Sequence, residues 1–495
     1  MYQKPSNIAI LITIFKFLLL SFSLIYVDRF NSDMIENIYW GQEWQAGYYK
    51  HPPMFAWVAE IWMQIFNNNI YCYHLLTSFI FSINTWLCFL LFRKIIDEKK
   101  AIIAIILMEG IVYSNFVNIC FNANTLLFVF HPLICLFAYK ITEKDGDKIK
   151  NWLIFGILTG LCMLTKYSSG LIILGCGLYI LYVRKFSIFR NAGFYLGSII
   201  SLCIFAPHIN WIISNNWLPL HYISDQQERS YGFFQSRFVY TYELFFALLL
   251  NSAPFIVAAL FIVKKPIFNK VKIGDNNSVF LLLLNIIPFF LMTIFGGVWV
   301  KDQWMIAHVF LIPCLFLWFI NCDLTKKRLI ACIGIIFLFF IGVTVYLIVV
   351  YKNSPKFADT LYNIPVKSQR ETYLDLAKII DQDWQNFYNE KPKYICSDEN
   401  IAGGIAMYSR ENNVLHVIPS CNLYISRWIN AEDLYNKGLV VISKNNDINH
   451  KQSTYIEVKN NKKYKVFEMF DKPKHTKSVA INSSDDRLFI HFYKK

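Results

Sequence analysis

The run IAILITIFKFLLLSFSLIYV, residues 8–27, decides the fold class. A helix of this length and apolar character can cross about 30 Å of hydrocarbon, and the runs 279–295 and 329–350 have the same character. Because the bilayer core holds no water, its backbone groups must pair with one another, so these runs are predicted to be helices. Residues 8–27 are longer than a signal-peptide core and no small-residue cleavage site follows them, so we expect a retained first span.

The composition of the whole chain agrees with a membrane protein. Of its 495 residues 55% are hydrophobic and 17% are charged, whereas soluble chains have about 25% charged residues. The predicted fold is a polytopic α-helical membrane protein with about eleven spans. We expect them near residues 8–27, 69–92, 101–119, 122–139, 152–165, 168–183, 192–213, 240–263, 278–296, 304–321 and 328–351.

The formal net charge of +14 would suit nucleic acid, but its distribution indicates membrane topology instead. With the N-terminus in the cytoplasm, 18 Lys and Arg residues fall in or beside the cytoplasmic loops. The opposite loops carry six: Arg29, Lys50, Lys166, Arg229, Arg237 and Lys301. This asymmetry is the positive-inside rule, so we expect a multi-pass protein of the bacterial inner membrane and no nucleic-acid partner.

A boundary is predicted near Tyr351, where apolar runs give way to mixed sequence. Residues 1–351 would form the transmembrane domain, with outer loops near 28–68 and 214–239, and residues 352–495 a soluble periplasmic α/β domain. The predicted elements of that domain are a helix at 371–388, short helices at 401–407 and 431–437, and strands at 393–396, 414–418, 438–442, 455–458 and 488–492. Cys396 and Cys421 also fall there, and in an oxidising compartment they could pair or stay free.

The first outer loop carries the candidate chemistry. Asp33 and Glu36 are spaced so that they share one face of a helix, and either could accept a proton or help to bind a cation. Lys50 and His51 follow within the stretch GYYKHPP, residues 47–53, whose two prolines stiffen the turn. A lysine suits a phosphate group, so the loop offers a candidate base and a candidate phosphate anchor together.

Four stretches of the sequence carry a family resemblance. The loop DMIENIYWGQEWQAGYYKHPPMFAW, residues 33–57, resembles the first periplasmic loop of bacterial family 39 glycosyltransferases. These are relatives of the dolichyl-phosphate-mannose protein mannosyltransferases and of the lipid A aminoarabinose transferases. The stretches FNAN (121–124), LTKY (164–167) and WINAEDL (428–434) look like the same group in the same order.

The resemblance implies a C-type glycosyltransferase fold and a donor sugar carried on a polyprenyl monophosphate. It implies a hexosyl- or pentosyltransferase that inverts the anomeric centre. Asp33 matches the family's acidic position, although many relatives have two adjacent acids where this chain has Met34 and then Glu36. Lys50 matches the lysine expected near the donor phosphate, and Lys166 matches a further family position at the outer face, where we also expect contact with the donor phosphate. His51 is a candidate for phosphate contact beside Lys50.

Other polar and aromatic residues are weaker candidates for a pocket. This set comprises Tyr48, Tyr49, Tyr167, Asn122, Arg229, Arg237 and Lys301. Asn122 has an equally simple explanation as a helix cap, and Tyr167 as an interfacial aromatic. No cofactor is indicated. Asp33, Glu36 and His51 would allow a divalent metal ion without requiring one.

Two other functional classes compete with the transferase hypothesis. A transporter or flippase would place charges at the bilayer midplane, whereas these span interiors are nearly free of charge and the polar loop lies outside. A polysaccharide ligase or polymerase would be expected to have a large outer loop late in the chain. The transferase hypothesis leaves the sugar open, and lipid A, a cell-envelope glycan, another membrane lipid or a protein could be the acceptor.

Overall fold

The apolar runs of the sequence form helices in the computed structural model. It describes residues 4–25, 30–115, 120–227, 232–262, 267–268, 278–321, 325–353, 359–361, 364–366, 369–443, 455–458, 462–465, 470, 472–480 and 487–494. The chain divides into two compact units. The helical unit comprises residues 1–22, 77–213 and 220–346, and the mixed unit comprises residues 23–76, 214–219 and 347–495.

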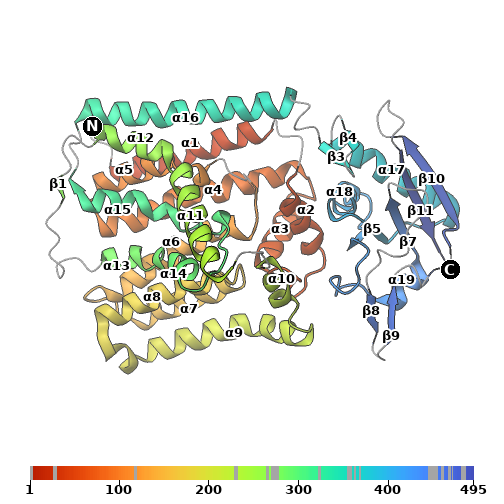
Figure 1. Ribbon diagram of the computed structural model, residues 1–495, viewed down its shortest axis with the longest axis horizontal. Coiled ribbons are helices and arrows are strands. Elements are labelled where there is room, and N and C mark those ends of the chain that lie inside the picture. Colours follow the sequence, from red (N-terminus) through yellow and green to blue (C-terminus); the bar gives the residue numbers. More distant parts are fainter. Residues whose placement is uncertain are drawn as a thin grey trace. The chain divides into compact units, whose positions relative to one another are not determined.

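The elements that lie mostly in the helical unit follow one another along the chain (Figure 1). Its α-helices are α1 Pro5–Ile25, α4 Tyr71–Ile95, α5 Glu98–Met108, α6 Ala123–Thr142, α7 Ile149–Met163, α8 Ser169–Arg184, α9 Ala192–Ser214, α10 Leu218–Gln226, α11 Phe233–Asn251, α12 Ala253–Ile262, α13 Ser278–Leu283, α14 Ile287–Ile294, α15 Ile312–Phe319 and α16 Lys326–Asn353. Short 3-10 helices are η1 Val112–Ser114, η2 Lys185–Arg190, η3 Asp302–Met305 and η4 Val309–Leu311, and β1 Ile267–Phe268 pairs with β2 Ile320–Asn321.

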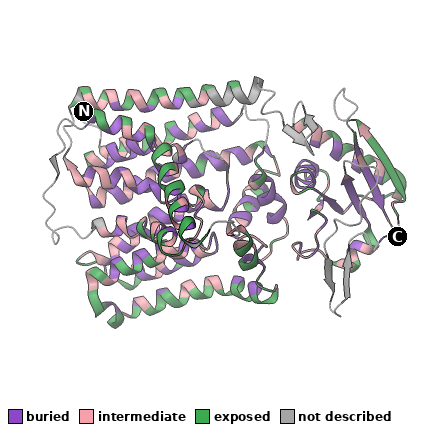
Figure 2. Cartoon of the chain, viewed as in Figure 1, coloured by how far each residue is buried: buried purple, intermediate pink, exposed green. Residues whose placement is uncertain are grey.

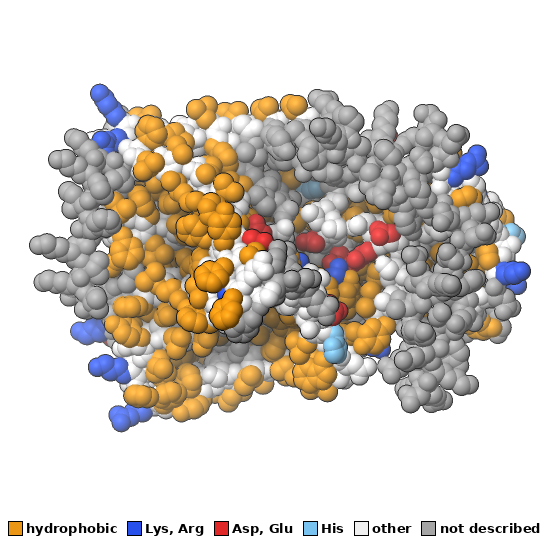
Figure 3. Space-filling view, viewed as in Figure 1, with side chains coloured by type: hydrophobic (Ala, Val, Ile, Leu, Met, Phe, Trp, Pro, Cys, Tyr) orange, Lys and Arg blue, Asp and Glu red, His pale blue; other side chains and the backbone are white. Residues whose placement is uncertain are grey.

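The helical unit has the composition of a membrane bundle. Among the described residues, α1, α4, α6, α8 and α9 are each long and apolar enough to cross a bilayer. Most of α4 and α6 is buried inside the protein, whereas α9 leaves apolar side chains such as Leu202, which is 62% exposed, on the surface (Figure 2). Hydrophobic side chains cover much of the visible face of this unit (Figure 3), as expected of a surface that contacts lipid.

Several predicted spans are broken helices rather than single rods. The predicted span 240–263 is α11 followed by α12, with a bend of 58° between them. The spans predicted at 278–296 and 304–321 are each divided into shorter helices. The helices α12, α14 and α15 each carry a proline in the first turn: Pro254, Pro288 and Pro313. Proline is tolerated there, but it lacks the N–H that would extend a preceding helix through this point, so a new helix begins. The multi-span helical fold is confirmed, and the number eleven stays a prediction.

The bundle holds one buried ion pair that the sequence analysis did not single out. Lys16 of α1 lies 2.8 Å from a carboxylate oxygen of Glu109, the residue that follows α5. The hydroxyl of Thr85 in α4 donates to the same carboxylate at 2.8 Å. All three side chains are buried, so the charges inside the bundle neutralise one another and link three helices.

Basic residues mark one end of three helices. Arg93 and Lys94 lie in the last turn of α4, Lys140 in that of α6 and Arg184 in that of α8. Lys94 pairs with Glu143 at 2.8 Å, and the guanidinium of Arg184 donates to the backbone oxygen of that same Glu143 at 2.6 Å. These contacts bring together the ends of α4, α6 and α8 that the charge pattern predicts to be cytoplasmic.

The mixed unit combines the first outer loop with the C-terminal third of the chain. Its helices are α2 Ser32–Gly41, α3 Met54–Ile65, α17 Gln369–Tyr388, α18 Glu399–Ser409 and α19 Ala431–Lys437. Its strands are β3 Asp359–Leu361, β4 Ile364–Val366, β5 Tyr394–Ser397, β6 His416–Pro419, β7 Leu439–Ser443, β8 Tyr455–Val458, β9 Lys462–Lys465, β10 His475–Ala480 and β11 Arg487–Tyr493.

A five-stranded sheet forms the core of the C-terminal part, in the order β10-β11-β7-β5-β6. The strands β6, β5 and β7 are parallel, whereas β11 runs antiparallel to both β7 and β10. In register, Cys396 of β5 pairs with Ile418 of β6 and with Val441 of β7. The predicted α/β character of this part is therefore confirmed, and β8 and β9 form a separate hairpin.

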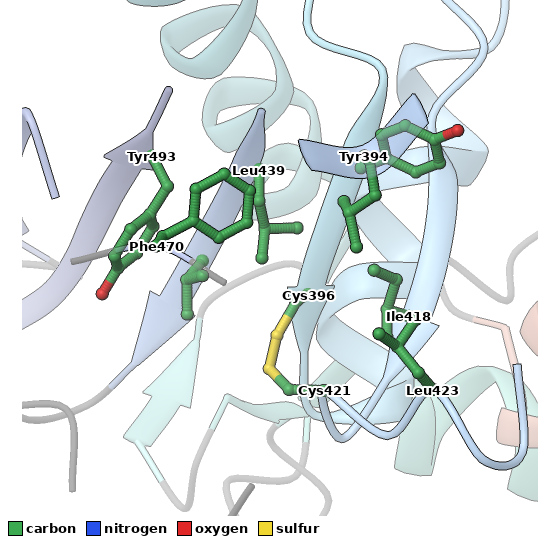
Figure 4. Close-up of a cluster of buried hydrophobic side chains, with 10 residues drawn as sticks. Tyr394, Cys396, Ile418, Cys421, Leu423, Leu439, Phe470 and Tyr493 are labelled. Atoms are coloured by element: carbon green, nitrogen blue, oxygen red, sulfur yellow. A yellow bond between two sulfur atoms is a disulfide. The ribbon is translucent and has the colours of Figure 1, made fainter. Parts of the chain in front are cut away.

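A disulfide joins Cys396 at the end of β5 to Cys421 just after β6 (Figure 4). Their Cα atoms are 5.0 Å apart, within the range that disulfides span. The cystine packs in an apolar cluster with side chains from β6 and β7, among them Ile418 and Leu439. It anchors the turn from β5 into α18, the turn that begins with Asp398.

Removing this disulfide should destabilise the mixed unit. Closing a loop over a sequence separation of 25 residues contributes roughly 3 kcal/mol to the free energy of unfolding. We expect Cys396→Ser with Cys421→Ser to lower the melting temperature of the full-length protein, and a reductant to lower that of the wild type only. Cys203→Ser, at an exposed cysteine of α9, is the matched control. If both thiols of the isolated protein react with a maleimide without reduction, the disulfide does not form in the cell.

Candidate functional site

The helix α2 places both predicted carboxylates of the first outer loop. The Asn31 side chain accepts from the backbone N–H of Asp33 at 2.8 Å and caps the helix. Asp33 lies in the first turn and is half-buried, and Glu36 lies one turn later and is buried. The apolar neighbours Met34, Ile35 and others bury the same helix, which is why Glu36 is withdrawn from water.

The stretch 47–53 forms a tight turn that presents Lys50. The backbone N–H of Tyr48 donates to the carbonyl of His51 at 3.0 Å, and this bond closes the turn. The ring of Tyr48 is fully buried and stacks on Trp40 at 4.6 Å, and its hydroxyl donates to the Trp40 carbonyl at 2.6 Å. Tyr48 is thus a packing residue under the loop rather than a lining residue.

Lys50 lies between two carboxylates from distant parts of the sequence. Its Nζ is 2.7 Å from Oε1 of Glu36 and 3.2 Å from Oε1 of Glu399, the first residue of α18. It also lies 5.0 Å from the centre of the Tyr49 ring, a cation–π contact. The Lys50 side chain is 18% exposed, so the ammonium is largely shielded from solvent.

The Glu399 carboxylate is itself held by several donors. The hydroxyl of Tyr39, on α2, donates to its Oε1 at 2.8 Å. Lys50 Nζ lies within hydrogen-bond distance of both oxygens, at 3.2 and 3.4 Å. The Glu36 carboxyl group lies close enough for the two carboxyl groups to shift each other's pKa. We call Glu36, Tyr39, Lys50 and Glu399 the carboxylate clasp.

The two carboxyl groups of the clasp have opposite pKa shifts. Burial raises the pKa of Glu36 well above its ordinary value, the neighbouring Glu399 charge raises it further, and Lys50 only partly opposes this. Burial also disfavours the charge of Glu399, but its hydrogen bonds from Glu36, Lys50 and Tyr39 lower the pKa of that group overall. Protonation is therefore favoured at Glu36 and ionisation at Glu399, as expected of two adjacent carboxyl groups.

The basic and phenolic groups of the clasp remain protonated. Burial disfavours the charge of Lys50, but the adjacent Glu36 and Glu399 carboxylates outweigh burial and raise its pKa above the ordinary value. Burial, with the nearby Glu399 and Glu36 charges, raises the pKa of Tyr39. Lys50 and Tyr39 are therefore both hydrogen-bond donors at physiological pH.

Tight packing between helices holds Glu399 in this position. A Cβ atom on Gly403 of α18 would lie 2.5 Å from Cγ2 of Ile35 and 2.9 Å from a ring carbon of Tyr39. A side chain at the neighbouring Gly404 would overlap the ring of Tyr373 on α17. The two glycines let α18 approach α2 and α17 closely, and this approach brings Glu399 to Lys50.

Two further ionic contacts join the loop to the C-terminal part within the mixed unit. Arg410 at the end of α18 lies 2.5 Å from Glu60 of α3, and its Nε donates to Oδ1 of Asn68 at 2.8 Å. Glu43 lies 2.8 Å from Nδ1 of His416 on β6. The Glu60 and Arg410 side chains are only 4% and 5% exposed, so this pair is fully desolvated.

The residue after Lys50, His51, packs against an aromatic ring. Its ring lies 5.7 Å from the ring of Phe55 in an edge contact. Across the described ranges, no three His, Cys, Asp or Glu side chains are grouped as they would be around a metal ion. Of the three proposed metal ligands, Glu36 is paired with Lys50, and a metal role for Asp33, Glu36 and His51 stays a prediction. The roles of His51 in phosphate contact and of Asp33 as a base stay predictions.

The remaining predicted residues lie in the helical unit. The ammonium of Lys166 is hydrogen-bonded to Oδ1 of Asn124 and lies 5.4 Å from the Trp304 ring. Tyr167 shares a hydrogen bond of 2.8 Å with Nε2 of His208. Asn122 caps α6 through a reciprocal pair of bonds with Thr125, which is the simpler of its two predicted roles.

The outer-loop cations of the helical unit pair locally. Arg237 donates to the carbonyl of Phe295 at 3.1 Å. Lys301 donates to Oε1 of Gln226 at 2.8 Å and lies 5.0 Å from the Trp299 ring. Arg229 lies outside the described residues.

Glu399 and Tyr39 were not among the predicted site residues. An acidic residue in the first turn of a helix is common because it interacts favourably with the helix dipole, so Glu399 in the stretch SDEN has an ordinary local explanation. Tyr39 is one of many aromatic residues in the loop. A shielded lysine requires negatively charged or polar partners, and this requirement predicts that Lys50 has such partners. Only the fold identifies Glu399 and Tyr39 as residues of the group around it.

Comparison with known proteins gives a family match over part of the chain and a similar fold. Residues 50–211 match the family described as dolichyl-phosphate-mannose-protein mannosyltransferase. The structure is similar to that of ArnT from Cupriavidus metallidurans bound to undecaprenyl phosphate, with a TM-score of 0.62, 10% identity and 97% of each chain covered. The apo form of ArnT gives a TM-score of 0.59 at 10% identity, covering 88% of this chain and 92% of ArnT. No curated protein matches.

Breaking the buried ion pair of the mixed unit should cost much of its stability. Arg410→Leu leaves the Glu60 carboxylate without its buried counter-charge, so we expect a loss of about 3–5 kcal/mol in the free energy of unfolding. Replacing both partners, Glu60→Met with Arg410→Leu, should restore most of that loss. Lys378→Ala, in a pair whose side chains are 68% and 73% exposed, is the control and should change little. Thermal unfolding in detergent measures all three, and equal losses in the single and double variants would contradict this account.

Proposed function

We propose that this chain, a glycosyltransferase of the C-type membrane fold, transfers a sugar from a polyprenyl-phosphate-linked donor to an acceptor at the outer face of the membrane. The predicted fold class and family resemblance are confirmed by the match to the mannosyltransferase family and the ArnT-like fold. Both similarities are to glycosyltransferases, so they replace the transporter alternative.

The observation that carries the proposal is the position of Lys50. The family match includes this residue, and the GYYKHPP turn presents its ammonium beside the two carboxylates of the clasp. ArnT, the structurally similar protein, is described with undecaprenyl phosphate bound. A lysine that stays charged in a shielded place is suited to a phosphate leaving group, which needs charge stabilisation more than it needs a proton.

The proposed reaction is a displacement at the anomeric carbon of the donor sugar. An acceptor hydroxyl or amine forms a bond to that carbon while the bond from carbon to phosphate oxygen breaks. The polyprenyl phosphate leaves with the electron pair, and the Lys50 ammonium stabilises its charge. The half-buried Asp33, which matches the family's acidic position, accepts the proton of the acceptor. Attack opposite the departing phosphate inverts the anomeric centre.

Glu36 has a different role from Asp33 in this proposal. While Glu36 is protonated, Lys50 faces only one negative charge, that of Glu399. Ionised Glu36 would add a second negative charge beside the donor phosphate and weaken its binding. Glu36 therefore tunes the charge of the phosphate site rather than taking part in proton transfer.

The location of the reaction is also part of the proposal. The charge asymmetry of the loops supports a periplasmic location for the mixed unit, on the outer side of a bacterial inner membrane. A disulfide between Cys396 and Cys421 supports an oxidising compartment for that unit. Lipid A, a cell-envelope glycan, another lipid or a protein would be the acceptor there.

The experiment that tests this function uses the full-length protein in detergent with a panel of undecaprenyl-phosphate sugars and candidate acceptors. Mass spectrometry would follow the loss of each donor and the appearance of undecaprenyl phosphate. We expect wild type to consume one donor and Asp33→Asn and Lys50→Ala to lower turnover at least about 100-fold, the size typical of losing a base or an oxyanion partner. Lys378→Ala is the control. If no donor in the panel is consumed with any acceptor class, while the folded protein moves lipid-linked sugar across liposomes, the proposal is wrong.

The pH dependence of donor binding should report Glu36. Its pKa is raised, so Glu36 is neutral below that raised value and becomes charged as the pH rises through it. We expect the KM for the donor to increase over this range because ionised Glu36 repels the donor phosphate, and Lys50, the cation beside it, already faces the Glu399 carboxylate. Glu36→Gln should keep turnover and lose this rise. A donor KM that is independent of pH in wild type, or a Gln variant with the same rise, would contradict the assignment.

A further inference from the structure

The Glu399 carboxylate is surrounded as a bound anion would be. Lys50 Nζ lies within hydrogen-bond distance of both of its oxygens, at 3.2 and 3.4 Å, and the Tyr39 hydroxyl donates to one of them at 2.8 Å. Two donors from the first outer loop, Lys50 and Tyr39, therefore converge on one negatively charged group. That group belongs to α18, and it comes from the other end of the chain.

We propose that Lys50 and Tyr39 form the binding site for the donor phosphate, and that Glu399 fills this site until the phosphate displaces it. This inference rests on the proposed function and extends it to Tyr39 and Glu399, neither of which the sequence analysis singled out. The ligand is a phosphate ester of a long-chain lipid.

The chemistry of the site favours exchange of one anion for another. A carboxylate and a phosphate both present oxygens to an ammonium and a hydroxyl, so Lys50 and Tyr39 can donate to either without rearranging. The two anions cannot share the site, because they would lie a few ångströms apart with a single lysine between them. Glu399 must therefore withdraw when the phosphate enters.

The exposure of the clasp is consistent with this exchange. The Glu399 side chain is 27% exposed, whereas that of Glu36 is 8% exposed. Glu399 stands at the first position of α18, where its side chain can turn away from the site without any change in the helix. Glu36 lies in the middle of α2 among buried neighbours and has no such freedom. Of the two carboxylates, Glu399 is thus the one that can leave.

Occupation of the site by Glu399 also explains how the shielded Lys50 ammonium stays charged when no donor is bound. Without a partner, the Lys50 ammonium would carry a large desolvation penalty. Glu399 adds to the compensation that Glu36 gives in the absence of donor, and the disulfide at Cys396 and the close packing at Gly403 keep Glu399 within reach. The C-terminal part of the mixed unit thereby contributes directly to donor binding.

The test measures binding of undecaprenyl phosphate to the full-length protein in detergent by native mass spectrometry. Glu399→Gln keeps the size and a hydrogen-bond acceptor but removes the competing charge, so we expect about tenfold tighter binding. Tyr39→Phe removes one donor, so we expect binding to weaken about fivefold. Asp398→Asn, at the adjacent N-cap of α18, removes an acidic charge outside the clasp and should leave binding unchanged.

Inorganic phosphate serves as a second probe, because a head group and a free anion share the same chemistry. Competition by millimolar phosphate that strengthens in Glu399→Gln would support the site. A gain for inorganic phosphate with none for the lipid would overturn its assignment to the donor. Unchanged or weaker lipid binding in Glu399→Gln, with an unaltered melting temperature, would also overturn it.

The outcomes separate this inference from the proposed function. If wild type consumes a donor and Lys50→Ala does not, but Glu399→Gln and Tyr39→Phe both bind the lipid like wild type, the inference is wrong and the function stands. If Glu399→Gln loses its fold, the Tyr39→Phe measurement decides: weaker binding at unchanged stability supports the site, and unchanged binding refutes it.

Discussion

A single ammonium group organises the mixed unit. Lys50 lies between two carboxylates, Glu36 from the first outer loop and Glu399 from the C-terminal third of the chain. A shielded positive charge must be matched by negative charge nearby, and this requirement draws α18 onto α2. The glycines of α18, the Glu60–Arg410 pair and the Glu43–His416 contact then fix the approach. The C-terminal part is in this respect a component of the site and not an appendage.

The sequence predicted the elements well where hydrophobic pattern alone decides them. The apolar runs became helices, and the strand predicted at 438–442 and the helix predicted at 371–388 lie within a residue or two of β7 and α17. It did not predict the breaks within 278–296 and 304–321, where prolines divide apolar sequence that hydropathy cannot distinguish from a single span. The edge strand β10 was also missed, since HTKSVA has exposed polar residues and lacks the alternation of a half-buried strand.

The site was predictable only in part, for a physical reason. The motif around Lys50 is local in sequence, so its carboxylate, lysine and proline spacing could be recognised there. Glu399 lies 349 residues from Lys50, and nothing in its own surroundings distinguishes it from an ordinary acid at a helix start. Asp33 and Glu36 looked equivalent in sequence, but burial separates them: one stays half-exposed at the helix start and the other is enclosed beside Lys50. Pairings between distant segments depend on the three-dimensional approach of helices, which single-residue patterns do not encode.

The long sequence separation between Lys50 and Glu399 delays their pairing during synthesis of the chain. A ribosome that adds about 5–20 residues per second needs roughly 20–70 s to pass from one residue to the other. Throughout that interval the first outer loop is made but its counter-charge is not, and the cysteines that secure the turn before α18 have yet to meet. The clasp can therefore close only after the whole bundle has been synthesised. Maturation of the site is in this way tied to completion of the chain.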